Sequence, residues 1–135
     1  MLKIFRKFFI VRRVRRKRAK TKKSKLDFDL YKKKALELVV SRLEYFNATY
    51  NFKYNSVKIK NATSRWGSCS SKGNLNFNYR IVLIDSKLSD YIIVHELCHL
   101  GEFNHSEMFW ELVEKTIPDY IHIREELKKI GLKMD

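Results

Sequence analysis

The spacing H-E-x-x-H at His95, Glu96 and His99 constrains the fold of this chain more than any other feature of its sequence. Residues four apart lie on one face of a helix, so His95 and His99 can point imidazole nitrogens at a single metal ion. Glu96, next to the first histidine, can reach a metal-bound water as general base. We therefore predict a buried helix at this position and a zinc ion, Zn2+, held by the two histidines.

His105 lies six residues beyond His99 and is the predicted third ligand. This separation equals that of the last two histidines in the metzincin pattern, although Glu102 occupies the glycine position of that pattern. Gly101, one residue earlier, is expected to end the helix in a left-handed conformation. A third protein ligand would leave the fourth position for water. Three carboxylates of the next segment compete with His105 as third ligand: Glu107, Glu111 and Glu114.

Length and cysteine content favour one small cytoplasmic domain. A chain of 135 residues can bury a core without disulfides. Cys69 and Cys98 lie far apart and form no C-x-x-C pair, which predicts a reducing compartment. Cys98 is interpreted as a buried apolar residue, because a fourth protein ligand would close the open position of the metal.

Positive charge is concentrated at the N-terminus. Residues 1–25 contain thirteen of the 29 Lys and Arg residues and none of the 15 acidic residues, so the net charge of +14 falls to +1 for residues 26–135. This predicts a basic arm, residues 1–25, and a balanced domain, residues 26–135. The arm has no signal-peptide pattern and is too charged to span a membrane. It is either a solvated tail or a contact to nucleic acid, ribosomes or an anionic membrane surface.

Hydrophobic periodicity in residues 26–135 predicts an α+β fold, in which a small antiparallel sheet packs on several helices. A first helix is expected to begin at Asp27 or Asp29 and to reach Phe46. Strands are expected at 57–60 and 75–83, with a loop at 61–73 that is rich in Ser, Gly and Asn. Three later helices are predicted at about 87–100, 107–116 and 119–130. The signals for their ends are Asp85 or Ser86, Ser106, Pro118 and Gly131.

Several further segments resemble those of one known family. They are S-R-W-G-S-C-S at 64–70, G-N-L-N at 73–76, D-Y at 90–91, H-E-L-C-H-L at 95–100, N-H-S at 104–106 and F-W at 109–110. Together they resemble the YgjP-like metallopeptidases over about residues 28–132. That family is a minimal zincin with a core similar to the SprT and WLM metallopeptidases. The resemblance implies a zincin-like fold and zinc bound by His95, His99 and His105, with Glu96 as catalytic base.

The predicted activity is hydrolysis of peptide bonds. Zinc would lower the pKa of its bound water toward about 7 and polarise the substrate carbonyl, while Glu96 would take the proton from that water. An extended peptide is expected to pair with the exposed edge of a strand around residues 74–81. Four residues are candidate substrate contacts: Arg65, Trp66, Asn76 and Asn78. Each of them also has a structural explanation. Trp66 can fill the core, Arg65 can pair with a carboxylate, and the two asparagines can simply be exposed to solvent.

Two other functions fit the same residues. A zinc hydrolase could act on phosphate esters or anhydrides, such as nucleotides, because metal-activated water can also attack phosphorus. Alternatively, a non-catalytic zinc module could dock on nucleic acid through residues 1–25. His122, far from the motif along the chain, is interpreted as a surface residue, and Tyr79 as a packed one.

Overall fold

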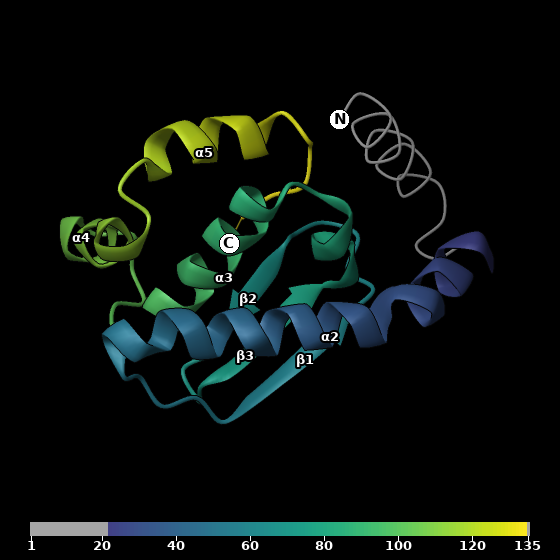
Figure 1. The fold of residues 1–135 in the computed structure, drawn as a ribbon, viewed down its shortest axis with the longest axis horizontal. Coiled ribbons are helices and arrows are strands. Elements are labelled where there is room, and N and C mark those ends of the chain that lie inside the picture. The colour runs from purple at the N-terminus through teal and green to yellow at the C-terminus, as the bar shows by residue number, and fades with distance from the viewer. Residues whose placement is uncertain (1–21, 135) are drawn as a thin grey trace.

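The computed structural model describes residues 22–134, and its mixed helices and strands confirm the α+β class (Figure 1). The elements of this part of the chain are α2 (Lys22–Tyr50), β1 (Ser56–Lys60), β2 (Gly67–Cys69), β3 (Asn74–Asn78), the 3-10 helix η1 (Tyr79–Leu83), α3 (Ser86–Cys98), α4 (Glu107–Thr116) and α5 (Tyr120–Lys128). Helices α2 and α3 pack against each other and against the sheet, and α4 and α5 pack on α3. Within residues 22–134, no helix combines the length and apolar composition needed to cross a membrane.

The sheet is mixed, so the expectation of an antiparallel sheet is wrong for one of its two pairings. The strand order is β1-β3-β2, with β3 parallel to β1 and antiparallel to β2. The segment 61–73, expected to be a loop, contains β2, whose Gly-Ser-Cys sequence has no hydrophobic alternation. A tight turn joins β2 to β3, with the Gly73 amide donating to the Ser70 carbonyl at 3.0 Å and Gly73 at φ +80°. This turn reverses the chain direction, so β3 runs antiparallel to β2.

Strand β3 ends at Asn78, five residues before the predicted end. The side chain of Asn78 accepts a hydrogen bond from the amide of Arg80 at 3.0 Å and caps η1. Its amide nitrogen donates to the carbonyls of Ala62 and Arg65, at 2.9 and 3.1 Å. The alternation of apolar residues continues past Asn78, but a local side-chain hydrogen bond to the backbone competes with the strand and ends it.

Helix α2 is longer at both ends than the predicted helix. It begins at Lys22, so the last four residues of the expected basic arm form its first turn. Neither Asp27 nor Asp29 starts the helix, because the lysines before them are good helix formers, and Ser24 bonds to Asn61 at 3.3 Å. Residues 1–21 lie outside the described part, so the predicted contacts of the arm with nucleic acid, ribosomes or membranes remain predictions.

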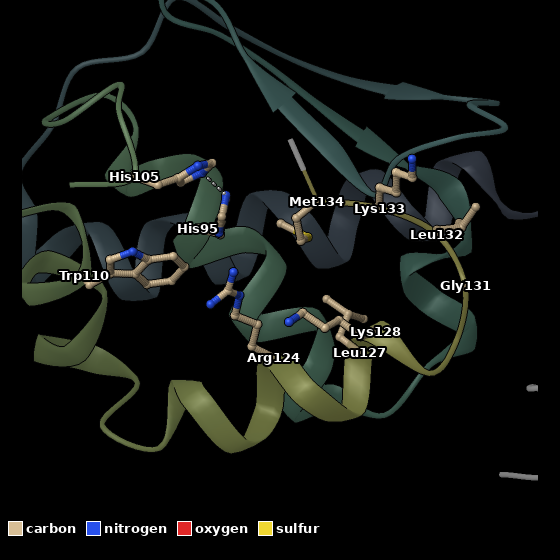
Figure 2. A pocket seen from close by; sticks show the side chains of 10 residues that line it. All are labelled: His95, His105, Trp110, Arg124, Leu127, Lys128, Gly131, Leu132, Lys133 and Met134. Atoms are coloured by element: carbon tan, nitrogen blue, oxygen red, sulfur yellow. Dashed lines mark hydrogen bonds between the residues drawn. The ribbon is translucent and has the colours of Figure 1, made fainter. Parts of the chain in front are cut away.

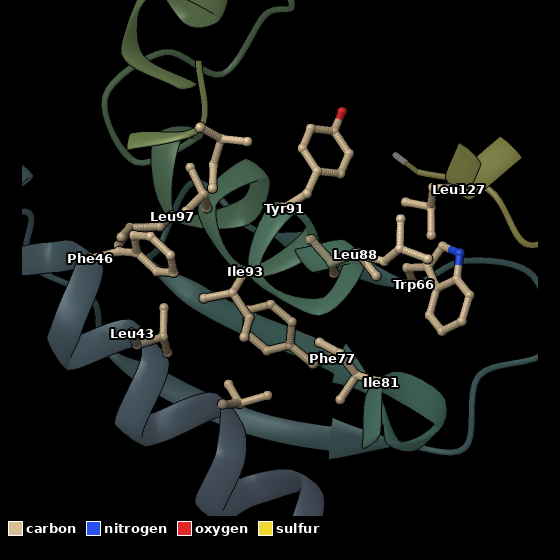
Figure 3. Close-up of a cluster of buried hydrophobic side chains, with 14 of the residues drawn as sticks. Leu43, Phe46, Trp66, Phe77, Ile81, Leu88, Tyr91, Ile93, Leu97 and Leu127 are labelled. Carbon is tan, nitrogen blue, oxygen red and sulfur yellow. The ribbon is translucent and has the colours of Figure 1, made fainter. Parts of the chain in front are cut away.

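Helix α3 lies at the centre of the molecule and is buried from Tyr91 to Cys98, and Figure 3 shows several of its side chains in the core. The core around it joins Leu43 and Phe46 of α2, Phe77 of β3 and Leu127 of α5. The predicted N-caps are confirmed, because Asp85 accepts from the Lys87 amide and Ser106 accepts from the Phe109 amide. A buried, capped helix is a rigid support for side chains that must be held in a fixed arrangement.

Gly101 does not end α3 in a left-handed conformation, as expected. The positive-φ residues of the described chain are Asn51, Gly73 and Gly131. Instead, the Gly101 amide donates to the Cys98 carbonyl at 3.0 Å in a tightened last turn. A Cβ at position 101 would lie 2.7 Å from Cζ of Phe52, so a side chain at this position would have to displace the Phe52 ring. Gly131, by contrast, has φ +95° just after α5. This left-handed conformation agrees with the prediction that Gly131 ends the last helix.

Candidate metal centre

Three imidazole nitrogens converge at one point beside α3. The Nε2 atoms of His95 and His99 are 3.2 Å apart, and Nε2 of His105 is 3.2 and 3.1 Å from them. A tetrahedral zinc ion with Zn–N bonds of about 2.0–2.1 Å separates its nitrogen ligands by about 3.3–3.4 Å. The triangle therefore fits zinc to within a few tenths of an ångström. The structure brings together all three histidines that the spacing predicted.

Hydrogen bonds on the far side of the rings orient two of the three imidazoles. Nδ1 of His99 is 3.0 Å from the carbonyl oxygen of Glu102, which can only accept, so the ring donates from Nδ1 and keeps a lone pair on Nε2. Nδ1 of His95 is 3.4 Å from the buried hydroxyl of Tyr91. Outer partners of this kind fix the tautomer and raise the basicity of a metal ligand.

Phe109 of α4 forms an aromatic wall against all three rings. Its ring centroid is 4.5 Å from that of His99 and 5.0 Å from those of His95 and His105. Phe109 is fully buried, whereas His105 is exposed at the end of the 99–106 loop. The cluster is therefore closed by apolar packing on one side and reaches solvent at His105.

Glu96 is fully buried and lies against strand β2. A Cβ built on Gly67 would be 3.0 Å from Cγ of Glu96 and 3.3 Å from its Oε1. The same Cβ would be 2.9 Å from the backbone oxygen of Asn76. Glycine at position 67 thus creates the space that the Glu96 side chain occupies. Sequence reasoning missed this role, although Gly67 lies in the 64–70 segment that supports the family resemblance.

A cavity of about 560 Å³ opens beside His95 and His105 (Figure 2). It extends between α5 and the C-terminal segment 131–134. The residues that line it, besides the two histidines, are Trp110, Arg124, Leu127, Lys128, Gly131, Leu132, Lys133 and Met134. Nothing in the sequence indicated that Arg124, Lys128 and Lys133 belong to the site. Their positions are those of ordinary surface charges on an amphipathic helix and near a chain end.

The four candidate substrate contacts do not line this cavity. Trp66 is a fully buried core residue, and Asn78 is 1% exposed, so the expected solvent exposure of Asn78 is wrong. Asn76 donates to Oγ of Ser68 at 3.2 Å. Arg65 pairs through its backbone with Lys133 in a parallel bridge, and its expected carboxylate partner is absent among residues 22–134.

Three further titratable residues lie where the sequence predicted, namely Cys98, His122 and Tyr79. Cys98 is buried, and this burial raises the pKa of its thiol to about 12. His122 is 77% exposed and pairs with Glu126 at 3.4 Å. The competing ligands Glu107, Glu111 and Glu114 are exposed and lie outside the histidine cluster. Tyr79 is packed, with 2% of its surface exposed.

An H-E-x-x-H helix, a converging third histidine and a small sheet beside them define a metallopeptidase of the zincin class. The family model described as YgjP-like, metallopeptidase domain, matches residues 3–130, and the chain belongs to this family. The resemblance seen in the sequence is thereby confirmed, and the family match reaches further toward the N-terminus than residue 28.

Solved structures support the same fold. The chain is similar to the metallopeptidase zymogen abylysin of Pyrococcus abyssi, with 25% identity, 72% of this chain and 99% of that chain covered, and a TM-score of 0.65. It is also similar in fold to the zymogen jannalysin of Methanocaldococcus jannaschii, with 21% identity, coverages of 67% and 94%, and a TM-score of 0.59. No curated protein matches the sequence.

Proposed function

We propose that this metallopeptidase is zinc-dependent, with the metal held by His95, His99 and His105 and with Glu96 as general base. The observation that supports the proposal is the triangle of Nε2 atoms with sides of 3.1–3.2 Å. Three lone pairs directed at one point repel one another unless a cation lies between them, and imidazole nitrogen is a preferred ligand of zinc. When bound, zinc would polarise the substrate carbonyl and lower the pKa of water.

Glu96 would accept the proton of the attacking water and pass it to the leaving amine. Its burial strengthens its electrostatic interactions, because the effective dielectric constant is lower there than in water. Gly67 and Phe109 would act as positioning residues. Gly67 leaves room for the Glu96 side chain, and Phe109 packs against the three imidazoles.

The strand that would bind an extended substrate is β2 rather than β3. Strand β3 is paired on both sides, so its backbone cannot accept another strand, contrary to the expectation for residues 74–81. Strand β2 is at the edge of the sheet and packs on α3 beside Glu96. The neighbouring residues Ser64 and Trp66 already bond to Lys133 through their backbones, which leaves 67–69 for the substrate. An edge strand of this kind can add a peptide strand.

The Glu96→Gln variant tests the mechanism. It should bind about one zinc per chain, as the wild type should, and lose about 10²–10⁴-fold in peptide turnover, because the metal ligands stay while the base is lost. Zinc is measured by elemental analysis and turnover with a pool of quenched fluorescent peptides. Glu111→Gln, a substitution of an exposed residue on α4, is the matched control and should retain full activity. An active Glu96→Gln protein would refute the assigned base.

The same protein variants, assayed also with nucleotides and with nucleic acid, separate the two alternatives. Turnover of nucleotides without any turnover of peptides would favour the phosphohydrolase. Nucleic-acid binding that depends on residues 1–25 and persists in inactive Glu96→Gln would favour the docking module. Family membership and the fold neighbours support the peptidase over both.

A further inference from the structure

The cavity beside the histidines has a strongly positive lining. Three of the residues that line it are basic, namely Arg124, Lys128 and Lys133, and no acidic residue among 22–134 lines it. Figure 2 shows that Arg124 and Lys128 project from α5 into the space that His95 faces, whereas the Lys133 ammonium points away from them. A concave site lined by positive charges raises the local concentration of anionic groups. The cavity is therefore suited to an anion.

Arg124 is held in place by an aromatic stack rather than by a carboxylate. Its guanidinium carbon lies 4.9 Å from the ring centroid of Trp110, and it forms no ion pair with any residue of the described chain. Trp110 stacks on Tyr120 at 5.1 Å and on His105 at 5.9 Å. A guanidinium that lies over a ring keeps its in-plane N–H donors for a planar acceptor such as a carboxylate. Arg124 thus presents donors next to the predicted metal ligands.

Lys128 adds a second cation one helical turn away on α5. Its Nζ is 3.1 Å from Oε1 of Glu125, but both side chains are more than half exposed, at 57% and 60%. Exposed pairs of this kind are weak, so Lys128 can exchange Glu125 for a ligand at little cost. Apolar side chains complete the lining, with Leu127 and Leu132 buried and Met134 half-buried. They would contact the methylene groups of a bound side chain.

We infer that this cavity is a specificity subsite for a carboxylate of the substrate peptide, bound by Arg124 and Lys128. The inference rests on the proposed peptidase function and deepens it. The carboxylate can belong to an Asp or Glu side chain near the scissile bond or to the C-terminus of the peptide. Both sources present the same planar, bidentate acceptor to a guanidinium.

The test uses zinc-loaded full-length protein and Ala-based hexapeptides. Each peptide has one Glu or one Gln, placed in turn at every position, and each is made with a free or an amidated C-terminus. We expect a preference of about 10–100-fold in kcat/KM for a Glu side chain or a free C-terminus at one position. The preference should fall with rising salt, because the cations are exposed. If amidation abolishes the preference, the carboxylate is the C-terminus of the peptide. If the exchange of Glu for Gln abolishes it, the carboxylate is the side chain.

Substitutions assign the preference to the cavity. In Arg124→Gln the ratio between acidic and neutral peptides should fall toward one, and in Arg124→Glu a peptide with Lys at that position should be preferred. Lys129→Gln, a substitution at the C-cap of the same helix and at a residue that does not line the cavity, should keep the wild-type ratio. Equal cleavage of acidic and neutral peptides by the wild type would overturn the subsite and leave the peptidase intact.

Binding to an inactive variant keeps the two proposals distinguishable. If the wild type cleaves no peptide, the peptidase proposal fails, and calorimetry with zinc-loaded Glu96→Gln still measures the affinities for the paired peptides. At least about tenfold tighter binding of the carboxylate peptide, lost in the additional variant Arg124→Gln, would support the subsite. Equal affinities for both peptides would refute it.

Discussion

Gly67 and Glu96 are in contact across the boundary between sheet and helix, and the contact leaves no room for a side chain at position 67. Gly67→Ala should therefore displace the Glu96 carboxylate, because the backbone oxygen of Asn76 on the other side cannot move easily. We expect a loss of stability of about 1–3 kcal/mol, typical of overpacking. Peptide turnover should fall while zinc content stays at the wild-type level. Ser71→Ala in the nearby turn is the control, and wild-type turnover in Gly67→Ala would contradict the positioning role.

Cys98 makes stability depend on pH at the alkaline end. Its thiol has an ordinary pKa near 9.0, which burial raises to about 12 in the folded chain. Because the folded pKa is the higher one, this contribution is fully present below pH 9.0 and is lost as pH rises toward 12. The free energy of unfolding should therefore fall with rising pH in this window, and Cys98→Ala should reduce the slope. Urea titrations at several pH values measure this slope, and Cys69→Ala, which changes the half-buried cysteine, is the control.

At the scale of elements, α2 is attached to the site helix by a bidentate ion pair. Nε and Nη2 of Arg42 donate to the two carboxylate oxygens of Asp90, at 2.8 and 3.0 Å. Arg42→Lys keeps the charge but cannot form both bonds, so we expect a loss of about 1 kcal/mol in unfolding free energy. Arg124→Lys, which changes an arginine without an ion pair in residues 22–134, should change stability less. A similar loss in both variants would show that the Arg42 pair contributes little.

At the scale of the whole molecule, a bound metal would join α3 to α4. His95 and His99 belong to α3 or its cap, whereas His105 precedes α4. A ligand that binds only the folded state stabilises it, so a chelator should lower the melting temperature and added zinc should restore it. Amide exchange should rise most in residues 99–116 when the metal is removed. His105→Ala should reproduce this pattern without a chelator, and an unchanged melting temperature on chelation would argue against a tightly held ion.

Much of the architecture follows from local rules. The caps at Asp85 and Ser106, the periodicity of the last three helices and the left-handed Gly131 depend on residues close together in sequence. Two of the errors involve distant partners. Strand β2 pairs with β3 without a hydrophobic alternation of its own, and Asn78, expected to be exposed, is buried and donates to the carbonyls of Ala62 and Arg65. Local patterns contain no information about such partners.

The candidate site divides in the same way. By itself, the sequence determined the class of protein and the convergence of His95 and His99, because helical geometry places residues four apart on one face. Only the tertiary structure decided that Gly67 makes room for Glu96 and that Arg124 and Lys128 lie beside the histidines. Gly67 precedes His95 by 28 positions, and Arg124 and Lys128 follow His99 by 25 and 29 positions. Their proximity to it results from the packing of β2 and α5 on α3, which no short-range spacing specifies.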